Sequence, residues 1–93
     1  KKKFLKMFRI GKVINYYEKI GVTIVELSGN LAVGDTIKIY KDGEEILVSE
    51  INEILLNQKS VVSAERHDMV ALHLNANVKK ESEVYKVSLL GAR

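Results

Sequence analysis

Apolar side chains recur at every second position in several short runs of this sequence, and this spacing constrains the fold most. Ile37 and Ile39 share one face of the run 35–40, and Val70, Leu72 and Leu74 share one face of the run 69–74. Successive side chains of a β-strand point to opposite faces, so the spacing predicts half-buried strands. We predict seven strands, near residues 10–16, 20–28, 35–40, 45–54, 59–65, 69–74 and 84–89.

The run 45–56 fits a period of two less well than its neighbours. Val48, Ile51 and Ile54 are three residues apart, a spacing that also suits one face of a helix. We expect a long strand with a β-bulge near Ser49-Glu50, because a bulge reverses the side-chain phase and the neighbouring runs are strands. Just before this run, Asp42-Gly43 predicts the tight turn of a hairpin.

Many short strands without a long helical pattern favour an all-β barrel or sandwich. The chain has 93 residues, enough for one domain with a modest core. Closure removes exposed sheet edges, and the sequence has no proline that could protect such an edge. We therefore expect an all-β, closed, six- or seven-stranded Greek-key-like barrel over residues 9–93, preceded by a basic N-terminal arm at residues 1–8.

Basic residues are concentrated at the N-terminus. Six of the 15 Lys and Arg lie in the first twelve positions without an acid, so nine face 12 acids in the rest of the chain. Such an arm can neutralise phosphates, and Phe4 and Phe8 can stack on bases. The alternatives are a solvated chain end, or an arm held to the barrel by these aromatic rings. The predicted nucleic-acid-binding residues are Lys1, Lys2, Lys3, Lys6, Arg9 and Lys12.

Several kinds of site are not expected. The sequence has no cysteine, which excludes disulfides, thiolate zinc sites and thiol nucleophiles. A metal needs three or four converging ligands, whereas His67 is expected in a surface turn and His73 on the outward face of a strand. No apolar run reaches the roughly 20 residues that span a bilayer. We expect a cytoplasmic protein with no cofactor, no metal, no membrane contact and no catalytic residue.

The stretch Leu31-Ala32-Val33-Gly34-Asp35 has the composition of a tight corner before a strand. Gly34 can adopt a backbone conformation that a Cβ disfavours, and the carboxylate of Asp35 can accept hydrogen bonds from nearby backbone N–H groups. Leu31 would then lie beneath the turn. A catalytic carboxylate is the alternative for Asp35, but no partner base, nucleophile or metal ligand lies near it in sequence.

This corner carries a resemblance to a known family. The pattern Leu31-x-x-Gly34-Asp35-x-Ile37 resembles the barrel that follows the GTPase domain in translation factors such as elongation factor Tu and initiation factor two. The similarity continues in Gly11-x-Val13, Val48-x-x-Ile51, Val61-x-x-Ala64 followed by His67-Asp68, and Val70-Ala71-Leu72-x-Leu74, and covers roughly residues 10 to 87.

The sequence departs from that family at three points. His67 replaces the usual Gly of a second corner, and Ser82-Glu83 replaces a third Gly-Asp pair. His tolerates a positive φ better than most residues, so the second corner can survive the change. No phosphate-binding loop of the Gly-x-x-x-x-Gly-Lys-[Ser/Thr] type is present, so we expect no GTP binding by this chain.

The chain also resembles the barrels found as C-terminal appendages of collagenase-like peptidases, and the opening 10-IGKVINYY-17 suits that group. The first resemblance implies a stand-alone, non-enzymatic binding module that contacts RNA (tRNA or rRNA) or a translation-related protein. The second implies a protein-interaction accessory domain like the peptidase appendage. We expect the first function and keep the second as the alternative.

Overall fold

The computed structural model describes residues 4–74 and 77–89, which contain ten strands and no helix. The all-β class is therefore confirmed, although the strands outnumber the predicted six or seven. Within these residues no helix is long and apolar enough to cross a bilayer. The strands are β1 (Phe4–Tyr17), β2 (Val22–Leu27), β3 (Leu31–Ala32), β4 (Thr36–Lys41), β5 (Glu44–Glu50), β6 (Ile54–Leu56), β7 (Lys59–Val61), β8 (Ser63–Ala64), β9 (Met69–His73) and β10 (Glu83–Leu89).

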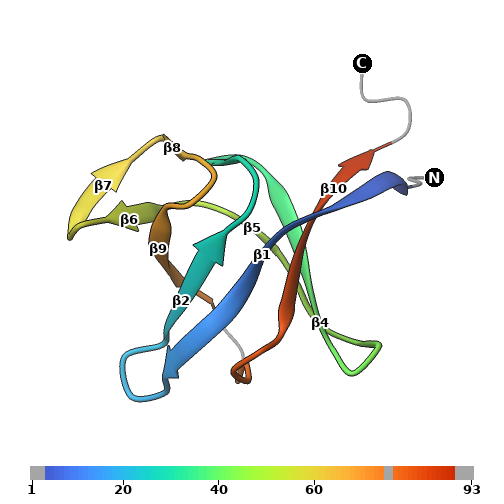
Figure 1. Cartoon of the computed structure of the whole chain (residues 1–93), viewed down its shortest axis with the longest axis horizontal. Helices are drawn as coiled ribbons and strands as arrows, with labels where there is room; N and C mark the ends of the chain where they lie inside the picture. The colour runs from blue at the N-terminus through green and yellow to red at the C-terminus, as the bar shows by residue number, and fades with distance from the viewer. Residues whose placement is uncertain (1–3, 75–76, 90–93) are drawn as a thin grey trace.

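Eight of these strands form one antiparallel sheet in the order β5-β4-β10-β1-β2-β9-β6-β7, and β3 pairs separately with β8. The last strand, β10, lies between β4 and β1. Its final residue, Leu89, pairs with Phe4, the first residue of β1 (Figure 1). No pairing between the end strands β5 and β7 is found in residues 4–74 and 77–89. Closure of the sheet into a barrel thus stays a prediction.

Residues 4–8, which the sequence assigned to the arm, form the first part of β1. Lys6 pairs with Ser88 and Phe8 with Lys86 on β10, and the two strands run side by side in Figure 1. The register shifts between Arg9 and Gly11, which leaves Ile10 as an extra residue on β1. Such a bulge bends a strand and increases its twist.

The core follows the predicted alternation. Ile37 and Ile39 are fully buried from β4, as are Val70 and Leu72 from β9. On β2 both faces are largely apolar, and the face that carries Thr23, Val25 and Leu27 points inward. Burying one such aliphatic side chain contributes about 1.5–3 kcal/mol, so this face fixes the register of β2.

The stretch 45–54 is not one strand with a bulge near Ser49-Glu50. The strand β5 ends at Glu50, and β6 begins at Ile54 after a corner. Ile51 and Ile54 are both buried, because the chain turns between them and brings each side chain back to the core. The bulge lies elsewhere on β5, at Ile46, where the register with β4 shifts.

Two predicted turns are confirmed. Asp42 and Gly43 both have positive φ, 54° and 80°, in the hairpin between β4 and β5. At the second, Gly34 has φ 99°, and the carboxylate of Asp35 accepts a hydrogen bond from the backbone N–H of Ala32 at 2.9 Å. Leu31 lies buried beneath this corner, as expected. Asp35 thus shapes the backbone here.

Candidate binding groove

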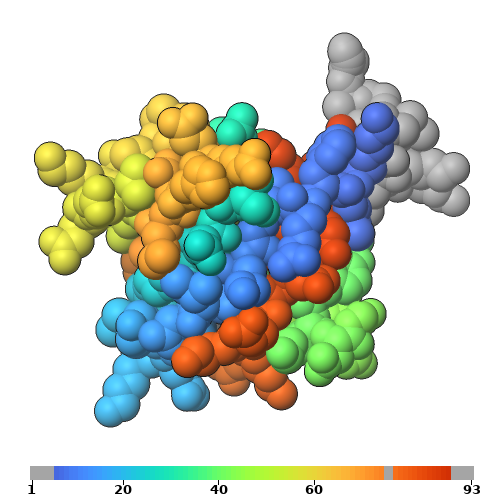
Figure 2. Space-filling model, in the orientation of Figure 1, coloured from blue at the N-terminus to red at the C-terminus, as the bar shows by residue number. Residues whose placement is uncertain are grey.

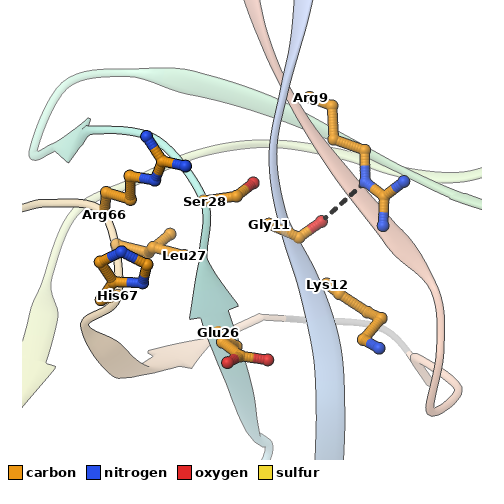
Figure 3. Close-up of a pocket in the computed structure, with 8 residues that line it drawn as sticks. All are labelled: Arg9, Gly11, Lys12, Glu26, Leu27, Ser28, Arg66 and His67. Carbon is orange, nitrogen blue, oxygen red and sulfur yellow. Dashed lines mark hydrogen bonds between the residues drawn. The ribbon is translucent and has the colours of Figure 1, made fainter.

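A groove lies between β1, the end of β2 and the corner that precedes β9. Its volume is about 300 Å³. In Figure 2, β1 crosses the visible face of the molecule, with β2 and the residues before β9 on one side and β10 on the other. The lining residues, shown in Figure 3, are Arg9, Gly11, Lys12, Glu26, Leu27, Ser28, Arg66 and His67.

Backbone hydrogen bonds hold the walls of this groove together. The N–H of His67 donates to the carbonyl of Leu27 at 2.9 Å, and the N–H of Leu27 donates to the carbonyl of Asp68 at 2.9 Å. On the other side, the N–H of Ser28 donates to the carbonyl of Ile10 at 2.7 Å. The end of β2 is therefore fixed both to β1 and to the corner before β9.

The corner at His67 has the same construction as the one at Asp35. The N–H of Glu65 donates to the carboxylate of Asp68 at 2.9 Å, and the N–H of Asp68 donates to the carbonyl of Glu65 at 2.9 Å. His67 occupies the position of Gly34 and has φ 79°. The prediction that His67 sits in a surface turn with positive φ is confirmed, and His73 is exposed on β9 as expected.

Gly11 allows β1 to pass close to β2 at the middle of the groove. A Cβ at this position would lie 2.8 Å from Cγ1 of Val25 and 2.9 Å from the carbonyl oxygen of Glu26. Both distances are shorter than ordinary van der Waals contacts, and the second involves backbone that pairs within the sheet. Any larger residue would therefore push the two strands apart.

Arg9 and Lys12 line the groove from β1 but lie near acids of the neighbouring segment. The Arg9 guanidinium is 3.7 Å from the Glu83 carboxylate, and its Nε donates to the Gly11 carbonyl at 3.5 Å (Figure 3). The Lys12 ammonium is 3.5 Å from the Glu81 carboxylate. All four side chains are roughly half exposed, and pairs of this kind contribute only about 0–1 kcal/mol. These cations therefore stay available to a ligand.

Arg66 is the third cation of the groove. Its side chain is exposed, and within the described part of the chain no acid lies within ion-pair distance of it. Figure 3 shows its guanidinium beside Ser28, above the ring of His67. The one acidic side chain in the lining is Glu26. Arg9, Lys12 and Arg66 thus outnumber the acids of the groove itself.

The structure places the predicted nucleic-acid-binding residues in different positions. Arg9 and Lys12 line the groove together, whereas Lys6 is exposed on β1 outside the lining. Lys1, Lys2 and Lys3 lie outside the described residues. The side chain of Phe4 is likewise not described, and Phe8 is 48% exposed, so Phe8 does not hold an arm to the barrel.

Sequence reasoning missed Arg66 as a member of this site. Arg66 lies in a predicted turn, 54 positions from Lys12 in the sequence. Only the backbone hydrogen bonds between Leu27 and the His67-Asp68 corner bring it to the groove beside β1. The residue pattern of the second corner did locate the turn. It contained no signal that the turn abuts the end of β2.

A smaller polar cluster lies on the far side of Arg9. The hydroxyl of Tyr85 donates to Oε1 of Glu83 at 3.1 Å, and the rings of Tyr85 and Tyr40 meet edge to face with centroids 5.6 Å apart. The hydrogen bond to Glu83, helped by partial burial and by the negative charge of Glu83, raises the pKa of Tyr85 above its ordinary value of 10.0. No group of three or more His, Asp or Glu side chains that could hold a metal occurs in residues 4–74 and 77–89.

Comparisons with known proteins relate the chain to peptidases. It is 33% identical over 76 residues to an uncharacterised protease of Methanocaldococcus jannaschii, a match that covers 82% of this chain and 19% of that protein. It is 26% identical over 78 residues to a collagenase of Porphyromonas gingivalis, covering 83% of this chain and 22% of the collagenase. The chain therefore spans about a fifth of the length of the curated relatives that it matches. No protein-family model matches it.

A solved structure has the same fold. The C-terminal domain of a Geobacillus thermoleovorans protein assigned to the U32 peptidases superposes with a TM-score of 0.78 at 16% sequence identity. The superposition covers 85% of this chain and 91% of that domain. Together with the sequence matches, it shows that the chain is similar to the C-terminal domain of U32 peptidases and collagenases, which confirms that part of the resemblance.

The prediction of a stand-alone translation-factor module that contacts RNA is wrong. The relatives and the solved structure are a protease, a collagenase and a peptidase domain. The residues that carried the translation-factor resemblance build corners and strands, and such residues specify backbone geometry rather than a ligand. The similarity favours the alternative, an accessory domain of a collagenase-like peptidase.

Proposed function

We propose that this chain is a non-catalytic accessory domain of a peptidase, and that it binds protein for a catalytic region that lies outside these 93 residues. The observation that carries this proposal is the pair of coverages above. The chain accounts for almost all of a solved U32 peptidase C-terminal domain, yet for only about a fifth of the curated protease and collagenase. The remaining length of those relatives offers ample room for the chemistry.

The surface of the chain supports a binding role. Arg9, Lys12 and Arg66 line one groove whose walls are fixed by backbone hydrogen bonds, with Arg66 on one side of β1 and the side chains of Arg9 and Lys12 on the other (Figure 3). Arginine side chains offer up to five N–H donors and do not lose a proton in proteins, so they suit recognition better than proton transfer. The proposal includes the predicted fold, in which the sheet closes into a barrel.

The experiment is a paired binding and hydrolysis assay on the purified 93-residue chain. Because one relative is named a collagenase, immobilised gelatin and native collagen are the first proteins to test. We expect retention on at least one of these supports, and no cleavage of dye-quenched gelatin or casein on long incubation. A chain that cleaves either substrate, or one that binds neither protein, would overturn the proposal.

A further inference from the structure

One cation of the groove, Arg66 at its edge, has no acidic partner in the described part of the chain (Figure 3). Arg9 and Lys12 have acidic neighbours at 3.7 and 3.5 Å, whereas Arg66 has none among residues 4–74 and 77–89. A guanidinium in a concave site presents a planar fork of donors that matches a carboxylate in a bidentate arrangement. The groove is therefore built to accept an anionic group at Arg66.

The surroundings of Arg66 add a hydrogen-bonding group. Ser28 lies beside the guanidinium in Figure 3, and its hydroxyl forms no hydrogen bond with another described residue. Its backbone N–H donates to the carbonyl of Ile10 at 2.7 Å, so the backbone of Ser28 is fixed while the hydroxyl can rotate about χ1. A ligand in the groove therefore meets an unpaired hydroxyl as well as the guanidinium of Arg66.

His67 is held next to Arg66 at a cost in backbone strain. Its φ of 79° lies in the left-handed region, where the equivalent corner has Gly34. The corner hydrogen bonds account for this conformation, and they place the imidazole at the edge of the groove. The ring adds a polar, aromatic wall below the guanidinium (Figure 3).

The charges also indicate which class of anion fits. Glu26 lies in the same groove, and beyond the first twelve positions the chain has 12 acids against nine bases. A nucleic acid, with one charge at every phosphate, would meet repulsion along this path. A peptide can place one carboxylate on Arg66 and an uncharged or basic residue near Glu26.

We propose that this groove binds a peptide segment that carries Asp or Glu, with the carboxylate on Arg66 and with Arg9 and Lys12 attracting flanking acids. This inference rests on the proposed function, since it names the chemistry of the protein that the accessory domain holds. A volume of about 300 Å³ is at the small end of the range for ligand pockets and accommodates one or two side chains.

The test uses two labelled peptides that differ only in charge, a Gly-Ser-flanked tri-glutamate and its tri-glutamine counterpart. We expect the wild-type chain to bind the glutamate peptide more tightly, and Arg66→Gln to weaken this binding about tenfold or more. Lys59→Gln is the matched control, because Lys59 is exposed on β7 outside the groove and its replacement changes the net charge equally. Amide resonances of Ser28 and His67 should shift on titration, whereas those of the β4–β5 hairpin should not.

Four results would overturn the inference. Equal weakening by Arg66→Gln and Lys59→Gln would show attraction to bulk charge only, and equal binding of the two peptides would show that the carboxylate is not recognised. Tighter binding of single-stranded RNA than of the glutamate peptide, lost in Arg66→Gln, would assign the groove to nucleic acid. Gelatin or collagen binding that Arg66→Gln leaves intact would refute the groove while leaving the accessory role in place, so the two proposals fail separately.

Discussion

The backbone N–H of Ile51 donates a hydrogen bond to the carbonyl oxygen of Asp35 at 2.8 Å. In return, the carbonyl of Ile51 accepts a hydrogen bond from the N–H of Gly34 at 2.8 Å. Ile51 is buried, and it connects β5 to β6 where the chain leaves one strand for the next. The Gly34-Asp35 corner thus fixes a second corner that is distant in sequence.

The same pair of hydrogen bonds occurs at two further corners, between His67-Asp68 and Leu27 and between Glu81-Ser82 and Val13. In each case the residue with positive φ donates its N–H to a buried apolar residue, and the following residue accepts one in return. The third corner lies one residue before the predicted Ser82-Glu83 pair. One repeated device therefore sets three bends of the sheet, and one of these bends forms a wall of the groove.

Removing the side chain of Asp35 should destabilise the fold. Asp35→Ala leaves the N–H of Ala32 without its acceptor and ends the 3.5 Å ion pair with Lys86, so we expect a loss of about 1–2 kcal/mol in the free energy of unfolding. Asp35→Asn keeps an acceptor oxygen, and its cost should stay near 0.5 kcal/mol, because a partly exposed ion pair contributes little. Urea denaturation measures both. Equal costs for the two variants would contradict the role of Asp35 as a hydrogen-bond acceptor.

Replacing Gly34 should destabilise the fold because of its backbone conformation. A Cβ at this position would have no atom within 4 Å, so Gly34→Ala tests the backbone alone, and we expect a loss of about 1–2 kcal/mol. Gly29→Ala is the control: its Cβ would make an ordinary 3.4 Å contact with Ile10, and its stability should change little. His67→Gly should have the opposite sign, a gain of up to about 1 kcal/mol, since it relieves a φ of 79°. Thermal unfolding of the three variants measures these changes in stability. A Gly34→Ala variant as stable as Gly29→Ala would contradict the cost assigned to the positive φ.

The corners also show what the sequence can and cannot reveal. Gly34-Asp35 was recognisable because a residue that tolerates positive φ and a short carboxylate act within four positions of each other. The corner at Glu81-Ser82 was not, since it has neither Gly nor Asp: Glu81 adopts φ 70°, and the hydroxyl of Ser82 donates to the carbonyl of Lys79 at 2.6 Å. A corner can be predicted from the sequence when its residues are the types that usually form one.

The candidate site was only half predictable for a different reason. Arg9 and Lys12 both belong to the basic N-terminus, but three positions on a regular strand would place them on opposite faces. The bulge at Ile10 brings them to the same face, opposite Tyr85 and Glu83. Arg66 joins them through pairing between segments about 40 residues apart, which no local pattern encodes. Function was misassigned because corner residues serve the backbone, and a translation-factor barrel and a peptidase appendage can share them.

The stability of the fold should fall at alkaline pH through Tyr85. Its pKa is raised in the folded state by the hydrogen bond to Glu83, whereas the unfolded chain ionises near the ordinary value of 10.0. The contribution is therefore fully present below pH 10 and is lost as the pH rises through the higher folded value. Glu83→Gln should lower the pKa of Tyr85, because it removes the charge that favours the neutral phenol. Difference titration of tyrosinate absorbance against Tyr85→Phe measures the shift, and an unchanged pKa in Glu83→Gln would refute this cause.

Replacing Thr23 should stabilise the protein. Thr23 is fully buried on β2, and its hydroxyl finds no hydrogen-bond partner among the described residues. Burying an unpaired hydroxyl costs about 1–3 kcal/mol, and valine has nearly the same shape without this group, so Thr23→Val should raise the free energy of unfolding by about 1 kcal/mol. Thr36→Val, at a partly exposed position on β4, should change stability by less than about 0.5 kcal/mol. If Thr23→Val is less stable than wild type in urea denaturation, the hydroxyl has a partner such as a bound water, and the inward face of β2 contains a polar site rather than a purely apolar one.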